Sequence, residues 1–424
     1  MEPSQDISPN NTGPNDTSGE VINYAEANHT ETNHTETNHA ETNHTETNHA
    51  ETNPMTPTLA ATDGPNLPPW LEQAAAQLLT TLGPQADSLD HQPEALTAAL
   101  QWLGQQGWLA LKVPVEWGGK ALNEEEYGWF REQLARCSGA LAFLQAQHQT
   151  AAALIASGDN DDLKTQYLPA IARGDRQLGI AFSHLRRADD PPIEGRAVAG
   201  GWEVTGTAPW VTGVGHFPEA VLAVPTAAGV LFGIVPLTAV QSGDRNIQPE
   251  PPMVLGAMNA TQTAAVTFDR WLIPEAAVIG LKPIDWIQQL DRRNALQGVY
   301  FALGCTQAAL DRLTVLFQEK RLLTIAVAHD TLRREFDQLR QQVYGRPIDK
   351  PYAQKLQLRA QAIALMGRAT QAALVAQGGR GILATNPAYR LQGEASIFAT
   401  SGQTPDILVA TLGAIVGKSP TALD

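Results

Sequence analysis

The chain has 424 residues, of which 43% are hydrophobic and 17% are charged, and this length can hold two or three folded domains. The formal net charge of −15 is concentrated near the N-terminus. Fifteen acidic residues precede the first basic residue, Lys112, and the remaining 29 acidic residues balance the 29 basic ones. A near-neutral body lacks the positive surface that binds polyanions, so we expect no nucleic-acid partner.

The sequence carries no signal for secretion or membrane insertion. Its N-terminus lacks basic residues and an apolar run, and no stretch reaches the roughly 18 apolar residues of a spanning helix. Cys137 and Cys305 are far apart in sequence and predict no disulfide framework. We therefore expect a cytoplasmic protein with no membrane partner.

Residues 1–65 predict a disordered, low-complexity tail. From Asn28 to Thr52 the pattern Asn-His-Thr/Ala-Glu-Thr occurs five times, with almost nothing apolar to bury. Half of the ten histidines lie in this repeat, at His29, His34, His39, His44 and His49. Histidines in a flexible chain bind metals weakly, so we predict no specific metal site and keep a metal-binding tail as the alternative. Met55 follows directly, and translation from Met55 would remove the repeat.

Residues 66–175 have the periodicity of helices. Leu71, Ala75, Leu78 and Leu79 recur at helical spacing, and a second helix places Tyr127, Phe130, Leu134 and Cys137 on one side. Asn123, followed by three glutamates, is typical of an N-cap with an acidic first turn. The Pro- and Gly-containing segment 113–119 predicts a loop.

Residues 176–282 predict a small β domain. Alternating residues on both sides of Gly200-Gly201 are typical of a hairpin. Short β-branched and apolar runs at 221–224, 230–235 and 264–269 predict further strands.

Residues 283–424 return to helical spacing. Apolar residues recur at helical spacing in two successive segments, which supports this prediction. They are Leu310, Leu313 and Phe317 in the first and Leu332, Phe336 and Leu339 in the second. The order of helices, β domain and helices indicates an α+β protein with an N-terminal helical domain, a middle β domain and a C-terminal helical bundle.

Five local motifs follow one another in this order over some 350 residues. They are Gly107-Trp108-Leu109 with Pro114 and Gly118-Gly119, the segment DLKTQYLPAIARG at 162–174, the segment GTAPWVTG at 206–213, Val266-Thr267-Phe268-Asp269 with Pro274, and the segment QGGRG at 377–381. Together they resemble the acyl-CoA dehydrogenase family from about residue 66 onward. The resemblance implies an FAD-binding oxidoreductase that acts on an acyl thioester and assembles as a homodimer or homotetramer.

The resemblance also implies a set of cofactor-binding residues. Trp210 would pack on the flavin ring, Ser183 and Thr212 would donate hydrogen bonds to it, and Gly378 and Gly379 would approach the diphosphate. Arg321 resembles an arginine that reaches the cofactor of a partner subunit, and Thr404 lies in the segment next to the site. The structural alternatives are a core aromatic for Trp210, an ordinary strand residue for Thr212, a helix-ending turn for the glycine pair and a solvated face for Arg321.

The family's catalytic glutamate has no counterpart in this sequence. An ungapped alignment places Gly402 at its position, and the stretch that holds the base in some relatives is Asp291-Arg292-Arg293-Asn294. Glu394 is the nearest acid, but it falls where the family has a structural aspartate; Asp406 is no better placed. Removal of an α-proton without a positioned base is slower by roughly 10²–10⁴-fold.

Three functions are compatible with this pattern. The first is a flavin dehydrogenase with a relocated base. The second is a flavin monooxygenase of the same fold, which needs no such base and for which His148 and His184 are candidate polar groups over the ring. The third is a catalytically silent relative that serves as a binding subunit. The amount of bound flavin separates the third function from the other two.

Overall fold

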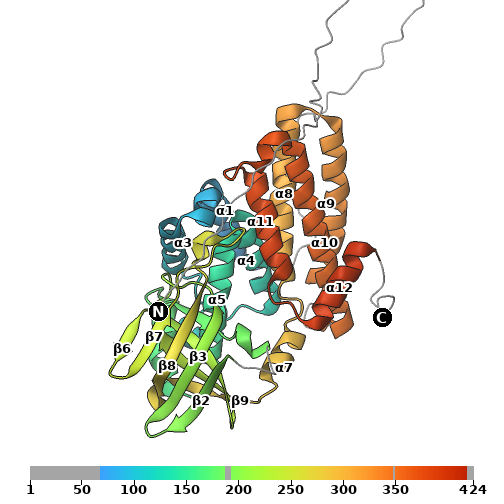
Figure 1. Cartoon of the computed structure of the whole chain (residues 1–424). Coiled ribbons are helices and arrows are strands. Elements are labelled where there is room, and N and C mark those ends of the chain that lie inside the picture. The colour runs from blue at the N-terminus through green and yellow to red at the C-terminus, as the bar shows by residue number, and fades with distance from the viewer. Residues whose placement is uncertain (1–66, 187–191, 347–348, 418–424) are drawn as a thin grey trace, which may run out of the picture. The chain divides into compact units, whose positions relative to one another are not determined.

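The computed structural model describes residues 67–186, 192–346 and 349–417. The predicted tail, with its histidine repeat and Met55, lies outside the described residues. Within the described part, helices occupy the chain up to Ala172, strands occupy 178–282, and helices resume at Trp286 (Figure 1). The predicted order of helical, β and helical segments is therefore confirmed.

The N-terminal helices begin with local signals that are legible in the sequence. The helices are α1 (Pro69–Leu82), α2 (Ala86–His91), α3 (Pro93–Gln105), α4 (Glu124–Cys137), α5 (Gly139–Ala156) and α6 (Asp161–Ala172), with short 3₁₀ turns η1 (Gly83–Gln85) and η2 (Val115–Trp117). The Asn123 side chain accepts hydrogen bonds from the backbone N–H groups of Glu125 and Glu126, both at 2.9 Å, while the Glu126 carboxylate accepts from the Asn123 N–H. This capping box confirms the predicted start of α4.

Burial follows the predicted helical stripes with one exception. Tyr127, Phe130, Leu134 and Cys137 are all buried along α4. In α1 the buried stripe is Leu71, Ala74, Leu78 and Leu82, whereas Leu79 is 43% exposed. The expectation for Leu79 was wrong, because both Leu78 and Leu79 match a helical period and only the tertiary contacts select one of them.

The middle segment folds into two sheets. One sheet has the strand order β1 (Leu178–Ala181), β4 (Glu219–Thr226), β5 (Gly229–Pro236) and β9 (Val278–Lys282); the other has β2 (Ile193–Val198), β3 (Gly201–Val211), β8 (Ala264–Pro274), β7 (Arg245–Pro249) and β6 (Val240–Ser242). The predicted hairpin is β2–β3, with Val198 paired to Gly201. A Cβ at Gly201 would lie 2.1 Å from the Ile273 carbonyl oxygen, so the close approach of β8 requires glycine there.

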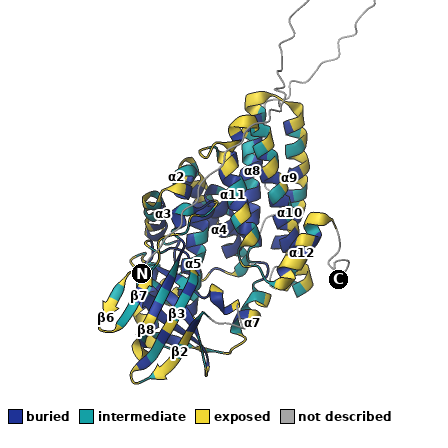
Figure 2. Cartoon of the chain, viewed as in Figure 1, coloured by how far each residue is buried: buried dark blue, intermediate teal, exposed yellow. Residues whose placement is uncertain are grey.

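The four-stranded sheet is buried on both faces. Leu222 and Val224 of β4 belong to the core shared with the five-stranded sheet. The alternate residues Val221 and Ala223 pack in a second core with helix α6. β4 therefore has buried residues on both sides, which explains why it is apolar at consecutive positions and does not alternate. Figure 2 shows exposed residues at the outer strand β6 of the other sheet.

The C-terminal segment is a set of packed helices. They are α7 (Trp286–Arg293), α8 (Val299–Lys320), α9 (Leu323–Tyr344), α10 (Tyr352–Gln377), α11 (Pro387–Thr400) and α12 (Pro405–Val416), with the 3₁₀ turn η6 (Gly378–Ile382) before α11. Figure 1 shows α8, α9 and α10 side by side. Helix α4 also packs on α8, where a Cβ at Gly304 would lie 2.3 Å from the Glu132 carbonyl oxygen.

A buried polar group joins the two helical segments. The Glu132 carboxylate of α4 is 2% exposed, accepts a hydrogen bond from Arg340 at 2.7 Å and another from the Tyr344 hydroxyl at 2.5 Å. Both partners come from α9, and an arginine with a tyrosine satisfies both carboxylate oxygens. Glu132 is thereby tied to a helix more than 200 residues later in the chain.

Candidate functional site

Two of the predicted ring-contacting residues lie next to each other. Trp210 is the penultimate residue of β3, and Ser183 begins the 3₁₀ turn η3 (Ser183–Arg186) that follows β1. The Ser183 hydroxyl donates to the Trp210 carbonyl oxygen at 3.4 Å. The Trp210 side chain is 49% exposed, so it is not the core aromatic of the structural alternative. A half-exposed indole fits a flat aromatic ligand that needs a stacking partner, and the Ser183 hydrogen bond holds η3 against the backbone of the same strand end.

Thr212 continues the same strand end but is largely buried. Its hydroxyl lies 3.1 Å from the hydroxyl of Thr263, which in turn lies 3.3 Å from that of Thr261. This row of hydroxyls links the end of β3 to the residues before β8. The Thr212 side chain therefore has a partner within the protein, and its position two residues after Trp210 keeps its backbone beside the exposed indole.

The residues predicted to contact the diphosphate form a second group. Arg321 caps the C-terminus of α8 with a left-handed backbone (φ 54°), and Gly378 follows the end of α10 with φ 75°. A Cβ at Gly378 would lie 3.9 Å from the Lys320 ammonium, and a Cβ at Gly379 would meet nothing within 4 Å. Lys320 donates to the carbonyl oxygens of Ala376 and Gln377 at 2.6 and 3.1 Å. Two open glycines beside two cations fit an anionic ligand.

The Gly402 position faces a cation rather than a carboxylate. Gly402 lies between α11 and α12 with φ 62°, and a Cβ there would lie 3.6 Å from Nη2 of Arg359. That nitrogen donates to the carbonyl oxygens of Ser401 at 2.7 Å and Gly402 at 3.3 Å, while Nη1 donates to Ala295 at 3.3 Å. Arg359 is 6% exposed, and burial lowers the pKa of its guanidinium to about 10.

An ion pair connects η3 to this region. Arg186 makes two hydrogen bonds to Asp291 of α7, Nε to Oδ2 at 2.9 Å and Nη2 to Oδ1 at 2.6 Å. Both Arg186 and Asp291 act electrostatically on Arg359, Asp291 raising the pKa of its guanidinium and Arg186 lowering it. The Ser183–Trp210 pair and the Arg359–Gly402 contact are thus linked through η3 and α7.

Glu394 is built into the interior. It is fully buried, forms a short ion pair with Arg390 and accepts the backbone N–H of Gly139 at 3.2 Å at the start of α5. Burial raises the pKa of Glu394 above its ordinary value, and the nearby Asp90 acts in the same direction, while Arg390 opposes them. A carboxylate that ties α11 to α5 in this way has a structural position.

The other candidates near the C-terminus also have local partners. Thr404 is the N-cap of α12, and its hydroxyl accepts the Ile407 N–H at 3.3 Å. Asp406 accepts a hydrogen bond from the Tyr352 hydroxyl at 2.8 Å. The Thr404 oxygen is therefore engaged in capping the helix.

His148 and His184 are interior residues. The backbone N–H of Leu178 donates to Nδ1 of His148 at 3.0 Å, and the imidazole stacks on Phe217 with ring centroids 6.3 Å apart. Burial lowers the pKa of His148 to about 4, so its ring is neutral near pH 7. Nε2 of His184 lies 2.8 Å from the Ala223 carbonyl oxygen. Both rings connect helical or turn segments to the four-stranded sheet.

Sequence reasoning missed Arg359 and Arg186. In α10, Arg359 is one of several polar residues at helical spacing, and its burial depends on Ala295 and Ser401, which come from other segments. Arg186 lies in the turn after Ser183, and its partner Asp291 comes from α7, more than 100 residues later. No local pattern distinguishes either arginine from a solvated one.

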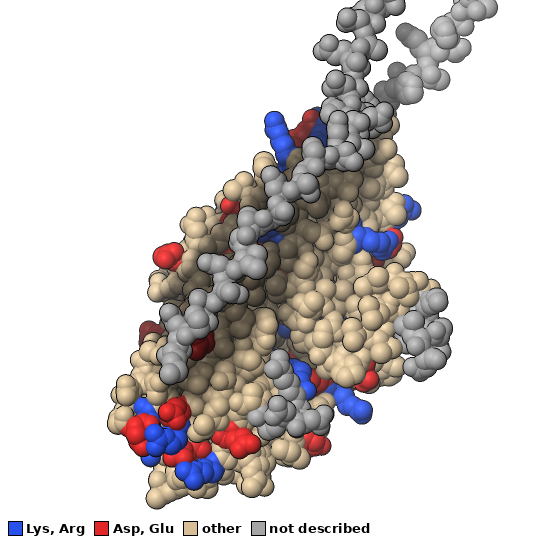
Figure 3. All heavy atoms as spheres, in the orientation of Figure 1, with Lys and Arg blue, Asp and Glu red and all other residues tan. Residues whose placement is uncertain are grey.

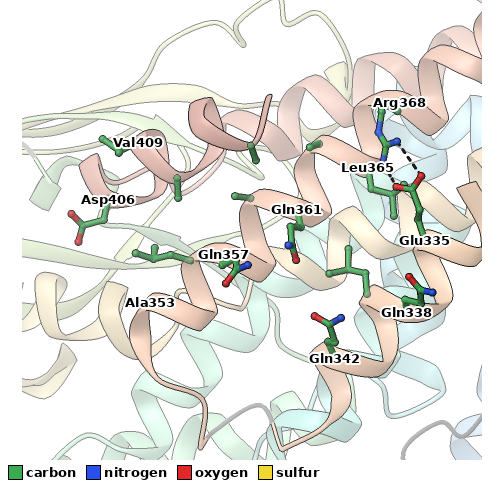
Figure 4. Close-up of a pocket in the computed structure, with 16 residues that line it drawn as sticks. Glu335, Gln338, Gln342, Ala353, Gln357, Gln361, Leu365, Arg368, Asp406 and Val409 are labelled. Carbon is green, nitrogen blue, oxygen red and sulfur yellow. Dashed lines mark hydrogen bonds and ion pairs between the residues drawn. The ribbon is translucent and has the colours of Figure 1, made fainter. Parts of the chain in front are cut away.

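A cavity among the described residues lies away from these groups. It has a volume of about 1160 Å³ and lies between α9, α10 and α12, as Figure 4 shows. Four amides line it, those of Gln338, Gln342, Gln357 and Gln361, and the Glu335–Arg368 ion pair closes one side. Of the candidate residues, Asp406 alone is in its wall.

Among the described residues, no helix is long and apolar enough to cross a bilayer.

Known proteins resemble this chain in sequence and in fold. The family described as acyl-CoA dehydrogenase, N-terminal domain, matches residues 70–175. Mitochondrial isovaleryl-CoA dehydrogenase of Pongo abelii is 24% identical over 50% of this chain and 52% of its own length. Probable acyl-CoA dehydrogenase fadE25 of Mycobacterium leprae is 24% identical over 57% of this chain and 63% of its own length.

The fold itself matches over a longer stretch. Glutaryl-CoA dehydrogenase of Mycobacterium smegmatis, solved in complex with FADH2, superimposes with a TM-score of 0.69 and 16% identity over 82% of this chain and 94% of its own. The sequence matches span between half and two thirds of the length of the two curated relatives. The N-terminal helical segment therefore matches the acyl-CoA dehydrogenase family, and the described fold, with its order of helices, two sheets and helices, is that of the solved glutaryl-CoA dehydrogenase.

Proposed function

We propose that this protein is a flavin-dependent oxidoreductase that binds FAD and acts on the CH–CH bond of an acyl thioester. The observation that carries the proposal is the half-exposed side chain of Trp210 at the end of β3, where the Ser183 hydroxyl donates to the Trp210 backbone carbonyl oxygen. An exposed indole offers an apolar face on which a flat aromatic ligand can stack. The similarity to acyl-CoA dehydrogenases adds the expectation that this ligand is a flavin.

The residues that would hold the cofactor fall into the two groups described above. Trp210, Ser183 and Thr212 would contact the ring, and Arg321, Gly378 and Gly379 would contact the diphosphate. The bound flavin would supply a hydride acceptor for the β-carbon of the thioester. The protein's own contribution would be to orient the ring and to exclude water from its substrate face.

The separation of these two groups supports a homodimer or homotetramer. Helix α8 has 22 residues and is therefore about 33 Å long. Its first turn lies beside Arg359, where a Cβ at Gly298 would be 3.0 Å from the guanidinium carbon, and Arg321 lies at its last turn. A single cofactor bound by both groups would thus draw them from different copies of the chain.

Cys137 and Cys305 are free thiols, which supports a reducing, cytoplasmic location.

The environment of Gly402 favours a second candidate, a flavin monooxygenase. A dehydrogenase needs a base for the α-proton. A side chain introduced at Gly402 would instead point toward the Arg359 guanidinium. An arginine stays protonated at neutral pH and cannot serve as that base. A reaction at reduced flavin with O2 needs no α-proton abstraction. The third candidate, a silent binding subunit, would explain the same loss without any chemistry.

The first experiment measures flavin in the purified full-length protein. We expect stoichiometric FAD, released on denaturation, and a Trp210→Ala protein that folds but holds much less flavin. Ser157→Ala is the control, because Ser157 is exposed at the end of α5 and its hydroxyl bonds only carbonyl oxygens of that helix. A protein that remains colourless after incubation with FAD would refute both enzymatic candidates and leave the silent subunit.

The second experiment separates the two enzymes. Anaerobic addition of an acyl-CoA bleaches the flavin of a dehydrogenase. A monooxygenase shows no bleaching but consumes O2 when an NAD(P)H-dependent reductase supplies reduced flavin. Bleaching would establish the first candidate and require a base that lies elsewhere in the chain or in a partner copy.

A further inference from the structure

The 3₁₀ turn η3 lies between the strands and helix α7. It contacts β3 and β4 on one side and α7 on the other. Figure 1 shows α7 between the strands of the middle segment and the C-terminal helices. Ser183 begins η3 and donates to the Trp210 carbonyl oxygen, so the position of Ser183 relative to the exposed indole depends on the contacts that hold this turn.

Buried contacts fix the inner side of η3. Phe182, the residue before the turn, meets the Trp286 indole of α7 edge to face, with ring centroids 5.7 Å apart. Within the turn, His184 and Leu185 are buried, and Nε2 of His184 lies 2.8 Å from the Ala223 carbonyl oxygen. The exposed side of the turn is held by a different kind of contact.

An ion pair holds the exposed side of η3, which carries Ser183 and Arg186. Arg186 donates from Nε and Nη2 to the two carboxylate oxygens of Asp291, at 2.9 and 2.6 Å. The two side chains are 29% and 18% exposed, so salt screens this pair less than it screens a fully exposed pair. Figure 3 shows basic and acidic side chains next to each other on the surface over α7. Two hydrogen bonds to one carboxylate also fix the orientation of the guanidinium, which a single contact does not do.

The helix that carries Asp291 is itself fixed at its C-terminal end. The ammonium of Lys355 donates to the Arg293 carbonyl oxygen at 3.4 Å, and Nη1 of Arg359 donates to the Ala295 carbonyl oxygen at 3.3 Å. Both donors come from α10. Since the first turn of α7 also packs on the four-stranded sheet, Asp291 offers Arg186 a partner whose position is set from both ends of the helix.

We propose that Arg186 and Asp291 are positioning residues for the flavin ring, because their ion pair holds the Ser183 side of η3 in place beside the Trp210 indole. This inference rests on the proposed function, which places the flavin ring on Trp210. Without the pair, the exposed side of the turn has to be ordered when the ring binds. Ordering a segment on binding lowers affinity, whereas a segment that is already held avoids this cost.

The test measures the dissociation constant of FAD for the full-length protein and its variants. Arg186→Met removes the charge at similar side-chain length, and Asp291→Asn keeps the shape of the acid. At an ionic strength of about 0.01 M, each should weaken FAD binding about three- to fivefold, the upper range for a partly exposed ion pair. The double variant should lose no more than either single variant, because all three remove the same interaction.

Two readouts separate positioning from a general loss of stability. Raising the ionic strength to about 1 M screens the pair, so the ratio of the variant and wild-type dissociation constants should fall toward one. Salt acts equally on the diphosphate contacts of every protein compared, and the ratio cancels that effect. Arg186→Lys should recover part of the affinity, because lysine keeps the charge but not the paired hydrogen bonds.

Arg196→Met is the matched control. Arg196 forms an ion pair with Glu203 of β3, also through two of its nitrogens. Glu203 and Trp210 lie on the same strand, seven residues or about 23 Å apart. The control therefore removes a comparable ion pair from the same sheet, and it should leave the dissociation constant of FAD unchanged.

The possible results have different meanings. Equal FAD affinity of Arg186→Met and the wild-type protein at low ionic strength overturns the positioning pair and leaves the proposed function standing. So does a loss that persists in full at about 1 M ionic strength, or single losses that add up in the double variant. A wild-type protein that does not bind FAD refutes the proposed function and this inference with it. Thermal unfolding identifies the folded variants, and if Arg186→Met does not fold, Asp291→Asn and Arg186→Lys decide the question.

Discussion

An introduced carboxylate at Gly402 tests whether the Arg359 charge faces that turn. Aspartate and asparagine both tolerate the left-handed backbone of Gly402, and they differ in charge at nearly equal shape. The comparison of Gly402→Asp with Gly402→Asn therefore cancels the backbone cost. A Cβ at this position would be 3.6 Å from Nη2 of Arg359, so an aspartate oxygen can reach hydrogen-bond distance.

The expected magnitude follows from the burial of Arg359. Burial lowers the pKa of its guanidinium from 12.5 to about 10, which corresponds to about 3 kcal/mol of unfavourable environment for the charge. A carboxylate at Gly402 relieves part of this cost. We expect Gly402→Asp to be more stable than Gly402→Asn by about 1.5–3 kcal/mol in the free energy of unfolding.

The difference in the free energy of unfolding between Gly402→Asp and Gly402→Asn depends on pH. The guanidinium favours the ionised carboxylate, so the folded pKa of the introduced acid lies below its unfolded value of about 3.9. The extra stability is fully present above that unfolded value and is lost as pH falls through the folded pKa. Urea unfolding of both variants at pH 7 and at successively lower pH measures the difference directly.

Two results would contradict this reasoning. Equal stability of the two variants at pH 7 would mean that the guanidinium does not face Gly402. A difference that persists in an Arg359→Met background would assign the effect to another charge.

Two further predictions concern the helical and β segments. Gly304→Ala should lower the free energy of unfolding by about 1–3 kcal/mol, because its Cβ would lie 2.3 Å from the Glu132 carbonyl oxygen. Gly367→Ala on α10 is the control: its Cβ would meet nothing within 4 Å, so the same denaturant titration should show no change or a gain in stability. His148 has a folded pKa of about 4 against 6.5 unfolded, so the stability it confers is present above pH 6.5 and falls as pH approaches 4. Between pH 7 and pH 5 the wild-type protein should lose about 2 kcal/mol more than His148→Asn, and equal losses would show that this imidazole is not buried in its neutral form.

The position of Trp210 decides how the site is interpreted. An aromatic in an alternating strand is equally consistent with a core residue and with a ligand-facing one. The structure leaves half of its side chain exposed and adds the Ser183 hydroxyl from a turn 27 residues earlier. The sequence motif located the strand. The exposure of Trp210 and its contact with a separate segment support a ligand-facing position for this residue.

Features that depend on neighbouring residues were legible in the sequence alone. The capping box at Asn123 and the β2–β3 hairpin at Gly200-Gly201 both formed as predicted. Hydrogen bonds in a cap or a tight turn join residues a few positions apart, so the residue types present already specify them. The same holds for the order of helical, β and helical segments, which follows from hydrophobic periodicity.

The tertiary structure alone decided which polar residues are buried and what they meet. Glu394, a weak candidate for a displaced base, is a buried partner of Arg390, and Arg359, for which the sequence made no prediction, lies against Gly402, 43 residues later. Periodicity assigns a side chain to a face of a helix but does not say what covers that face. The charge balance of a site depends on contacts between distant segments, and only the packing of those segments fixes it.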